Sequence, residues 1–82
     1  MNLEIYSKPD CPYCDRMKKV AEYLTSEKAF SVKVYTLKEN FTKEEFYDKF
    51  GVGSTFPQVI LNEKHLGGCI DSINYLQENN LL

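Results

Sequence analysis

The chain has 82 residues, of which 43% are hydrophobic, and this combination favours one compact domain over a disordered chain. The net charge of −2, with Lys and Arg scattered among Asp and Glu, gives no reason to expect nucleic-acid binding. No apolar run approaches the roughly 20 residues that span a bilayer, and the first residues lack the features of a signal peptide. We therefore expect a cytoplasmic protein, with residues 1–82 as a single domain and neither nucleic acid nor a membrane as a partner.

The first half of the chain predicts a strand, a helix and a second strand. Residues 3–7 alternate between apolar and polar side chains, which is typical of a short strand. A helix is predicted from near Cys11 to near Ser26, because apolar side chains recur there at helical spacing: Met17, Val20, Ala21 and Leu24. A second strand is expected at about 30–37.

The second half predicts a helix, a β-hairpin and a last helix. Thr42 and Glu45 have the spacing of a capping box, in which each side chain accepts a hydrogen bond from the other residue's backbone, and Gly51 is well placed to end that helix. The apolar run 59–61 predicts a strand, 62–64 a hairpin turn and 65–66 a short return strand. The last helix is expected to carry three side chains inward: Ile70, Ile73 and Leu76.

The predicted order of elements is β-α-β-α-β-β-α. A crossover helix between the first two strands makes that pair parallel, whereas the final hairpin is antiparallel. The sequence therefore predicts an α/β fold, with a mixed sheet covered by helices.

The segment Cys11-Pro12-Tyr13-Cys14 stands where the first strand gives way to a helix, which indicates redox chemistry. Residues i and i+3 at a helix start lie on one turn, so their sulfur atoms can meet. Unpaired N–H groups and the helix dipole stabilise a thiolate there, and such sites lower thiol pKa values to roughly 3.5–7.5. We expect Cys11 to be the exposed attacking nucleophile and Cys14 to be the resolving thiol.

Two other interpretations of the cysteines compete with this one. In the first, Cys11 and Cys14 are inert buried residues, but Pro12 and the strand-to-helix position argue against it. In the second, a zinc ion is held by three cysteines and one histidine: Cys11, Cys14, His65 and Cys69. Two glycines and the end of a strand separate His65 from Cys69, so we expect no metal site and interpret His65 as a polar surface residue.

Three blocks of this sequence resemble the glutaredoxins: residues 8–14, 55–58 and 67–71. The chain length and the stretch 64–68 are most similar to the small bacterial glutaredoxin 1 subgroup, whose members donate electrons to ribonucleotide reductase. The resemblance implies a thioredoxin-like fold, a four-stranded mixed sheet with helices on both faces, and a cis peptide bond before Pro57. It also implies a monomeric thiol–disulfide oxidoreductase that uses glutathione as co-substrate and needs no tightly bound cofactor. Disulfide-containing proteins, such as ribonucleotide reductase, are the partners it implies.

By the same resemblance, nine residues are expected to border glutathione: Lys8, Tyr13, Thr55, Phe56, Pro57, Gly68, Cys69, Ile70 and Asp71. The backbone of Phe56 would pair with the cysteine of glutathione, and Lys8 would meet the glycyl carboxylate. Backbone N–H groups of Cys69 and Ile70 would bind the γ-glutamyl carboxylate at the helix start. Asp71 would bind the ammonium group, although it equally fits a first-turn residue that only complements the helix dipole.

Three of these residues depart from the subgroup. Phe56 replaces a smaller Val, which would narrow the groove, and Ile70 stands where a hydroxyl residue is common, which removes one hydrogen bond to the ligand. We interpret Cys69 first as a small buried hydrophobe, with a redox role as the alternative. A scaffold for an iron–sulfur cluster is another alternative, but it belongs to relatives with Cys-Gly-Phe-Ser, and Pro12 argues against it here.

Overall fold

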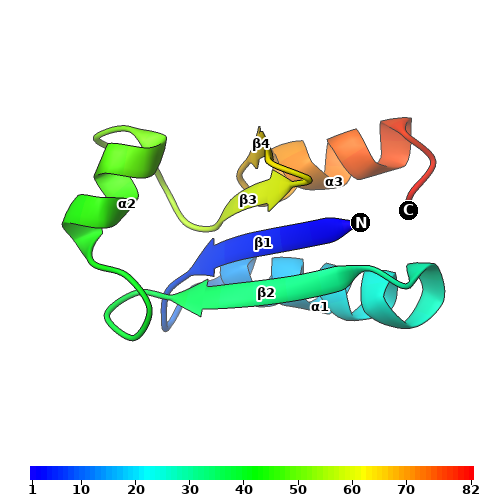
Figure 1. Cartoon of the computed structure of the whole chain (residues 1–82), viewed down its shortest axis with the longest axis horizontal. Coiled ribbons are helices and arrows are strands. Elements are labelled where there is room, and N and C mark those ends of the chain that lie inside the picture. Colours follow the sequence, from blue (N-terminus) through cyan, green and yellow to red (C-terminus); the bar gives the residue numbers. More distant parts are fainter.

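The computed structural model describes residues 1–82, which form four strands and three helices (Figure 1). In chain order the elements are β1 (Asn2–Ser7), α1 (Pro12–Lys28), β2 (Ser31–Thr36), α2 (Lys43–Phe50), β3 (Gln58–Leu61), β4 (Lys64–Gly67) and α3 (Cys69–Glu78). The strands lie side by side in the order β2-β1-β3-β4. β1 pairs in parallel with β2, while the β1–β3 and β3–β4 pairs are antiparallel. The predicted order of elements and the mixed sheet are both confirmed.

β1 is the central strand, and its alternating side chains separate the two faces of the sheet. Leu3, Ile5 and Ser7 are fully buried on one face, whereas Glu4 and Tyr6 point to the other. The register places Leu3 opposite Leu61 and Ile5 opposite Val59, so apolar side chains of neighbouring strands meet on the same face.

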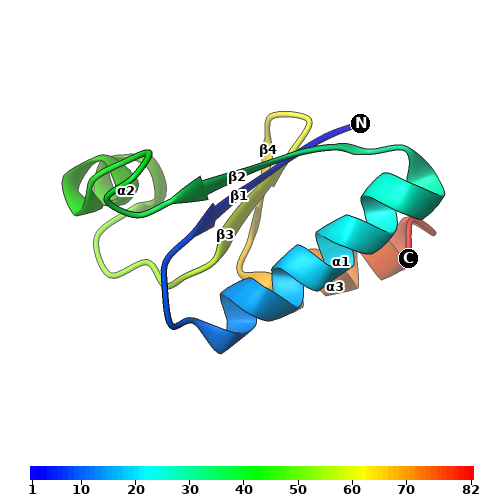
Figure 2. The same cartoon turned by 90° about the horizontal axis from the view of Figure 1, so that it is seen from below.

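Helices α1 and α3 cover this apolar face together (Figure 2). The main core contains ten buried residues from the sheet, both helices and the α1–β2 connection: Leu3, Ile5, Met17, Ala21, Leu24, Phe30, Val59, Leu61, Cys69 and Leu76. The predicted apolar face of α1 is therefore confirmed, with Val20 packed against its edge. The helix continues two residues beyond the expected end near Ser26. It ends at Lys28 because Ala29 adopts a left-handed conformation (φ 56°) and its N–H caps Leu24 O.

The expectation for α3 was only partly correct. Leu76 is fully buried and Ile73 is partly buried, but Ile70 is 49% exposed. The buried residues of α3 are instead Cys69, Ser72 and Leu76. The small side chains of Cys69 and Ser72 therefore occupy the buried face near the start of α3, and the large apolar side chain of Ile70 lies outside that face.

α2 lies beyond the ends of β1 and β2 and packs against the side chains of the opposite face (Figures 1 and 2). Phe46 is its buried residue, and Tyr6 and Tyr35 contact the same cluster from the sheet. The predicted capping box is present: Thr42 Oγ1 accepts from Glu45 N at 3.1 Å, and Glu45 Oε1 accepts from Thr42 N at 2.9 Å. Gly51 ends the helix with a φ of 102°, a conformation that favours glycine. Helices therefore pack on both faces, as predicted.

The β3–β4 hairpin turns through two residues, Asn62 and Glu63, which both adopt positive φ values of 47° and 70°. Lys64 was expected in the turn, but it pairs with Leu61 as the first residue of β4. A two-residue turn of this hand matches the twist of the strands that it joins. No helix in the structure is long and apolar enough to cross a membrane.

Candidate functional site

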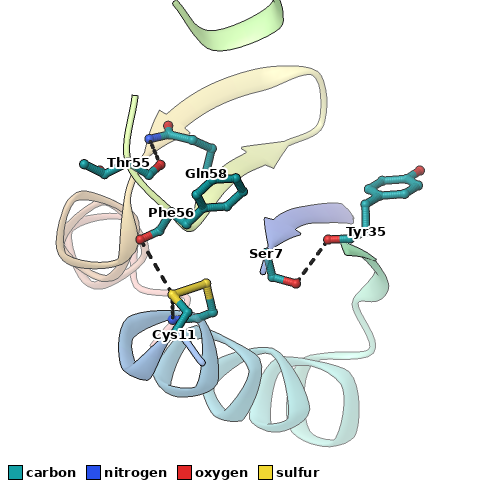
Figure 3. The surroundings of a disulfide bond; sticks show 7 residues. Ser7, Cys11, Tyr35, Thr55, Phe56 and Gln58 are labelled. Atoms are coloured by element: carbon teal, nitrogen blue, oxygen red, sulfur yellow. Dashed lines mark hydrogen bonds between the residues drawn. A yellow bond between two sulfur atoms is a disulfide. The ribbon is translucent and has the colours of Figure 1, made fainter. Parts of the chain in front are cut away.

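Cys11 and Cys14 form a disulfide at the start of α1, next to the end of β1 (Figure 3). Cys11 is the N-cap residue, with extended backbone angles (φ −128°, ψ 101°), and Pro12 begins the helix. Their Cα atoms are 5.1 Å apart, a separation that a disulfide spans readily. The spacing predicted from the sequence therefore brings the two sulfur atoms together.

The backbone N–H of Cys14 points at the sulfur of Cys11 and donates to it at 3.1 Å. This N–H is one of the groups that a helix start leaves without a backbone partner, so Cys11 takes the place of a capping side chain. In the reduced protein, the same bond and the helix dipole would stabilise a negative charge on Cys11 rather than on Cys14.

The expectation that Cys11 is exposed was wrong for this disulfide-bonded form. Cys11 is 6% exposed and Cys14 is fully buried. The capping geometry turns the Cys11 side chain back over the helix start, where it contacts Cys14 N and lies 3.9 Å from Phe56 O. The order of accessibility still matches the prediction, since Cys11 is the more accessible of the two sulfur-bearing residues.

Residues 55–57, which we call the Phe56 loop, form the wall opposite the disulfide (Figure 3). The peptide bond between Phe56 and Pro57 is cis, as the resemblance implied. The carbonyl oxygen of Phe56 lies 3.9 Å from Cys11 Sγ. The loop therefore brings a backbone edge to the sulfur that is expected to react.

The side chain of Phe56 anchors this loop to α2. Its ring stacks on the ring of Phe46, with centroids 4.1 Å apart and 9° between the planes. The ammonium group of Lys8 lies over the Phe56 ring, 5.3 Å from its centroid. Much of the extra volume of Phe56, compared with the expected Val, is thus taken up by contact with α2.

A groove of about 320 Å³ runs from the Phe56 loop to the start of α3, and we call it the Phe56 groove. It is lined by ten residues: Tyr13, Thr55, Phe56, Pro57, Gln58, Gly67, Gly68, Cys69, Ile70 and Asp71. Eight of the nine residues that the resemblance placed around glutathione therefore line one groove. The ninth, Lys8, is outside the lining and reaches the site through its contact with Phe56.

At the far end of the groove, backbone donors and a carboxylate lie close together. Gly68 is the N-cap of α3 and no side chain caps this helix, so its first N–H groups are available to an anion. Gly67 has a φ of 106°, and a Cβ atom at this position would lie 2.9 Å from Asp71 Oδ2. Glycine is therefore required for the Asp71 carboxylate to fold against the chain here.

Cys69 lines the groove, but its side chain belongs to the main core, and the residue is 4% exposed. Burial raises the pKa of the Cys69 thiol, and the positive charge of Arg16 only partly opposes this effect. The thiol is thus held in its neutral form, as expected for a small buried hydrophobe.

The residues of the zinc alternative do not come together. The chain contains no group of three or more His, Cys, Asp or Glu side chains placed to hold a metal ion. His65 is exposed, as expected of a surface residue, but its Nε2 lies 2.7 Å from Gln58 Oε1. Gln58 was not predicted as a site residue from the sequence. Its position directly after Pro57, within one of the three blocks that resemble glutaredoxins, could have indicated it.

Known proteins are similar to this chain in both sequence and structure. The glutaredoxin family profile matches residues 3–66. Glutaredoxin 1 of Salmonella typhimurium is 36% identical over 78 residues, which cover 92% of this chain and 90% of that protein.

Solved structures of glutaredoxins support the same family assignment. Reduced glutaredoxin of Escherichia coli superposes with a TM-score of 0.83 at 31% identity and 98% coverage of both chains. A buckwheat glutaredoxin–glutathione complex superposes with a TM-score of 0.65 at 25% identity, covering 96% of this chain and 71% of that one. The thioredoxin-like fold is thereby confirmed. With its Cys-Pro-Tyr-Cys disulfide at the start of α1, this chain belongs to the glutaredoxin family and is a thiol–disulfide oxidoreductase.

Proposed function

We propose that this protein reduces glutathione mixed disulfides and protein disulfides, with glutathione as the electron donor and Cys11 as the attacking nucleophile. The observation that carries this proposal is the position of the Phe56 groove. It runs from the Phe56 loop, whose carbonyl oxygen at Phe56 lies 3.9 Å from Cys11 Sγ, to the uncapped start of α3. A peptide in this groove could meet a backbone edge, N–H donors and a carboxylate along its length.

Glutathione offers chemical groups that match this sequence of features. Its central cysteine can pair with the backbone of Phe56, close to Cys11. Its γ-glutamyl carboxylate suits the N–H groups of Cys69 and Ile70, and its ammonium suits Asp71. We assign the glycyl carboxylate to Lys8, and the walls of the groove to four further residues: Tyr13, Thr55, Pro57 and Gly68. The glutathione named in the buckwheat complex supports this choice of ligand.

The proposed cycle starts when the Cys11 thiolate attacks a disulfide and displaces a thiolate. With a protein disulfide, Cys14 then attacks Cys11 Sγ, which releases the reduced protein and forms the Cys11–Cys14 disulfide. One glutathione thiolate attacks Cys11 Sγ and displaces Cys14, which takes up a proton. A second glutathione thiolate attacks the sulfur of the bound glutathione, so that glutathione disulfide leaves and the Cys11 thiolate is restored. Glutaredoxin potentials of about −200 to −230 mV lie close to that of the glutathione pool, which makes this recharging feasible.

We also propose that the chain acts as one monomeric domain in the cytoplasm, without a tightly bound cofactor. Its partners would be disulfide-containing proteins, among which ribonucleotide reductase is the candidate suggested by the similarity to glutaredoxin 1.

Two variants assayed on two substrates test this function. Cys11→Ser should abolish glutathione-dependent reduction of both a glutathionylated small thiol and a protein disulfide, because it removes the nucleophile. Cys14→Ser should keep the first activity and lose most of the second, because only protein disulfides require a resolving thiol. Equal loss of both activities in Cys14→Ser would contradict the division of roles, and full activity in Cys11→Ser would overturn the proposal.

A further inference from the structure

A chain of two side-chain hydrogen bonds leads from His65 on β4 to the Phe56 loop. Gln58 Nε2 donates to the backbone carbonyl of Thr55 at 2.8 Å (Figure 3), and Gln58 Oε1 lies 2.7 Å from His65 Nε2. Gln58 is only 7% exposed, so these bonds satisfy a buried amide that would otherwise lose its contacts with water. The His65 ring also packs against Phe50, with centroids 5.0 Å apart.

The direction of these bonds fixes the proton on His65. A backbone carbonyl only accepts hydrogen bonds, so the NH₂ group of Gln58 must face Thr55 O. The amide oxygen of Gln58 then faces His65, whose Nε2 must carry a hydrogen to donate. Neutral His65 in this arrangement is therefore the Nε2–H tautomer.

The bonded carbonyl of Thr55 shares a peptide plane with the N–H of Phe56. This peptide bond is trans, since the only cis bond in the chain follows Phe56. In a trans peptide, the C=O and the N–H point in opposite directions. Holding Thr55 O on Gln58 therefore turns the Phe56 N–H away from Gln58, and this N–H makes no hydrogen bond within the fold.

We infer that His65, acting through Gln58, is a positioning residue that orients the Phe56 N–H for the backbone of a bound glutathionyl cysteine. This inference deepens the proposed function and rests on it. The stack on Phe46 contacts only the side chain of Phe56 and makes no contact with the carbonyl or N–H of the preceding peptide plane. The Gln58 bond restrains that plane, and His65 keeps the Gln58 amide in the required orientation.

Steady-state kinetics with a glutathionylated small thiol measures the effect. His65→Ala should raise KM about three- to tenfold, as expected for one or two weakened hydrogen bonds, while kcat stays within about twofold of the original value. His65→Gln, which restores an N–H donor, should recover most of the loss. Lys64→Ala is the matched control, because Lys64 precedes His65 on β4 and its ammonium lies over Tyr75, outside the Phe56 groove.

The Gln58→Leu variant and its combination with His65→Ala test whether the two residues act as one unit. Gln58→Leu should raise KM at least as much as His65→Ala, and the double variant should resemble Gln58→Leu alone. If the two increases in KM multiply in the double variant, His65 does not act through Gln58, and the inference is overturned.

Nuclear magnetic resonance of the protein without glutathione gives a readout that does not depend on activity. The Phe56 amide resonance should shift in His65→Ala, should return toward its original position in His65→Gln, and should stay unchanged in Lys64→Ala. Imidazole ¹⁵N shifts should identify the Nε2–H tautomer. An unmoved Phe56 resonance or the Nδ1–H tautomer would overturn the inference. Absence of glutathione-dependent activity in the unmodified protein would instead refute the proposed function. The Phe56 and imidazole resonances would then still test whether His65 orients the Phe56 N–H through Gln58.

Discussion

The ring of Phe56 lies flat on the ring of Phe46, with centroids 4.1 Å apart and planes 9° from parallel. These residues belong to different parts of the fold, since Phe46 is the buried residue of α2 and Phe56 stands beside the disulfide. Phe46 also contacts Phe41, Tyr47 and Phe50. α2 therefore acts as the support on which the Phe56 loop rests.

Replacing Phe46 with Leu should loosen this support while keeping an apolar side chain in place. We expect Phe46→Leu to lower the free energy of unfolding by at least about 1 kcal/mol, because each aromatic pair contributes about this much beyond buried area and Phe46 makes four such pairs. The KM for a glutathionylated substrate should rise as the loop becomes less ordered. Urea unfolding and steady-state kinetics measure the two effects. If stability falls but KM does not change, Phe46 is a core residue only.

The reduced protein should be alkylated first at Cys11. The Cys14 N–H and the start of α1 stabilise a thiolate there, whereas Cys14 is fully buried and Cys69 is 4% exposed. Brief treatment with iodoacetamide at neutral pH, followed by mass mapping, locates the first label. Labelling of Cys69 before Cys11 would contradict the assignment of the nucleophile. Lys8→Ala should slow the reaction only slightly, because an exposed charge is screened by salt.

Asp71→Asn should raise the KM for glutathione about two- to tenfold, because it removes the charge proposed to bind the ligand's ammonium group. The effect should shrink at high salt, since Asp71 is exposed. Glu78→Gln, at the other end of α3, makes the same change of charge outside the groove and should leave KM unchanged. Equal KM values for Asp71→Asn and the unmodified protein would return Asp71 to a role in complementing the helix dipole.

Cys69 should make stability fall at alkaline pH. Burial raises the pKa of its thiol above the usual 9.0, so the folded protein keeps a proton that the unfolded chain releases. This contribution to stability is complete below the unfolded pKa and is lost as pH rises toward the folded pKa.

Urea unfolding of the disulfide-bonded protein from about pH 7 to about pH 10 measures this loss. In Cys69→Ala the alkaline part of the decline should become shallower. Burial and the nearby Glu4 raise the pKa of Tyr6 and of Tyr35. These tyrosines do not affect the comparison, because the unmodified protein and Cys69→Ala both retain them. Identical pH profiles for the two proteins would contradict the assignment.

Local patterns in the sequence predicted the elements and most of the site. The capping box of Thr42 and Glu45 and the two cysteines one turn apart involve residues within three positions of each other, so spacing alone identifies them. The groove required the resemblance as well, because its walls come from three separate segments.

The errors arose where side-chain packing and hydrogen bonding in the folded protein, rather than the spacing of residue types, decide the outcome. The exposure of Ile70 depends on which side of α3 faces the sheet, and the small Cys69 and Ser72 settle that. The low exposure of Cys11 depends on its side chain turning back to cap α1. The bond from His65 to Gln58 spans seven residues across a bulged strand pair, which periodicity does not reveal.

The order of the strands also bears on self-association. β2 and β4 form the two edges of the sheet, and an edge strand offers unpaired backbone groups to a strand of another molecule. β4 has four residues and pairs with β3 through an irregular register, which makes it a poor template. β2 has six residues and exposes the apolar side chain of Val34. The neighbouring Lys33, however, places an exposed positive charge near the middle of this strand. A lysine at this position disfavours addition of a further strand, so we expect Lys33 to oppose edge-to-edge association of the sheet.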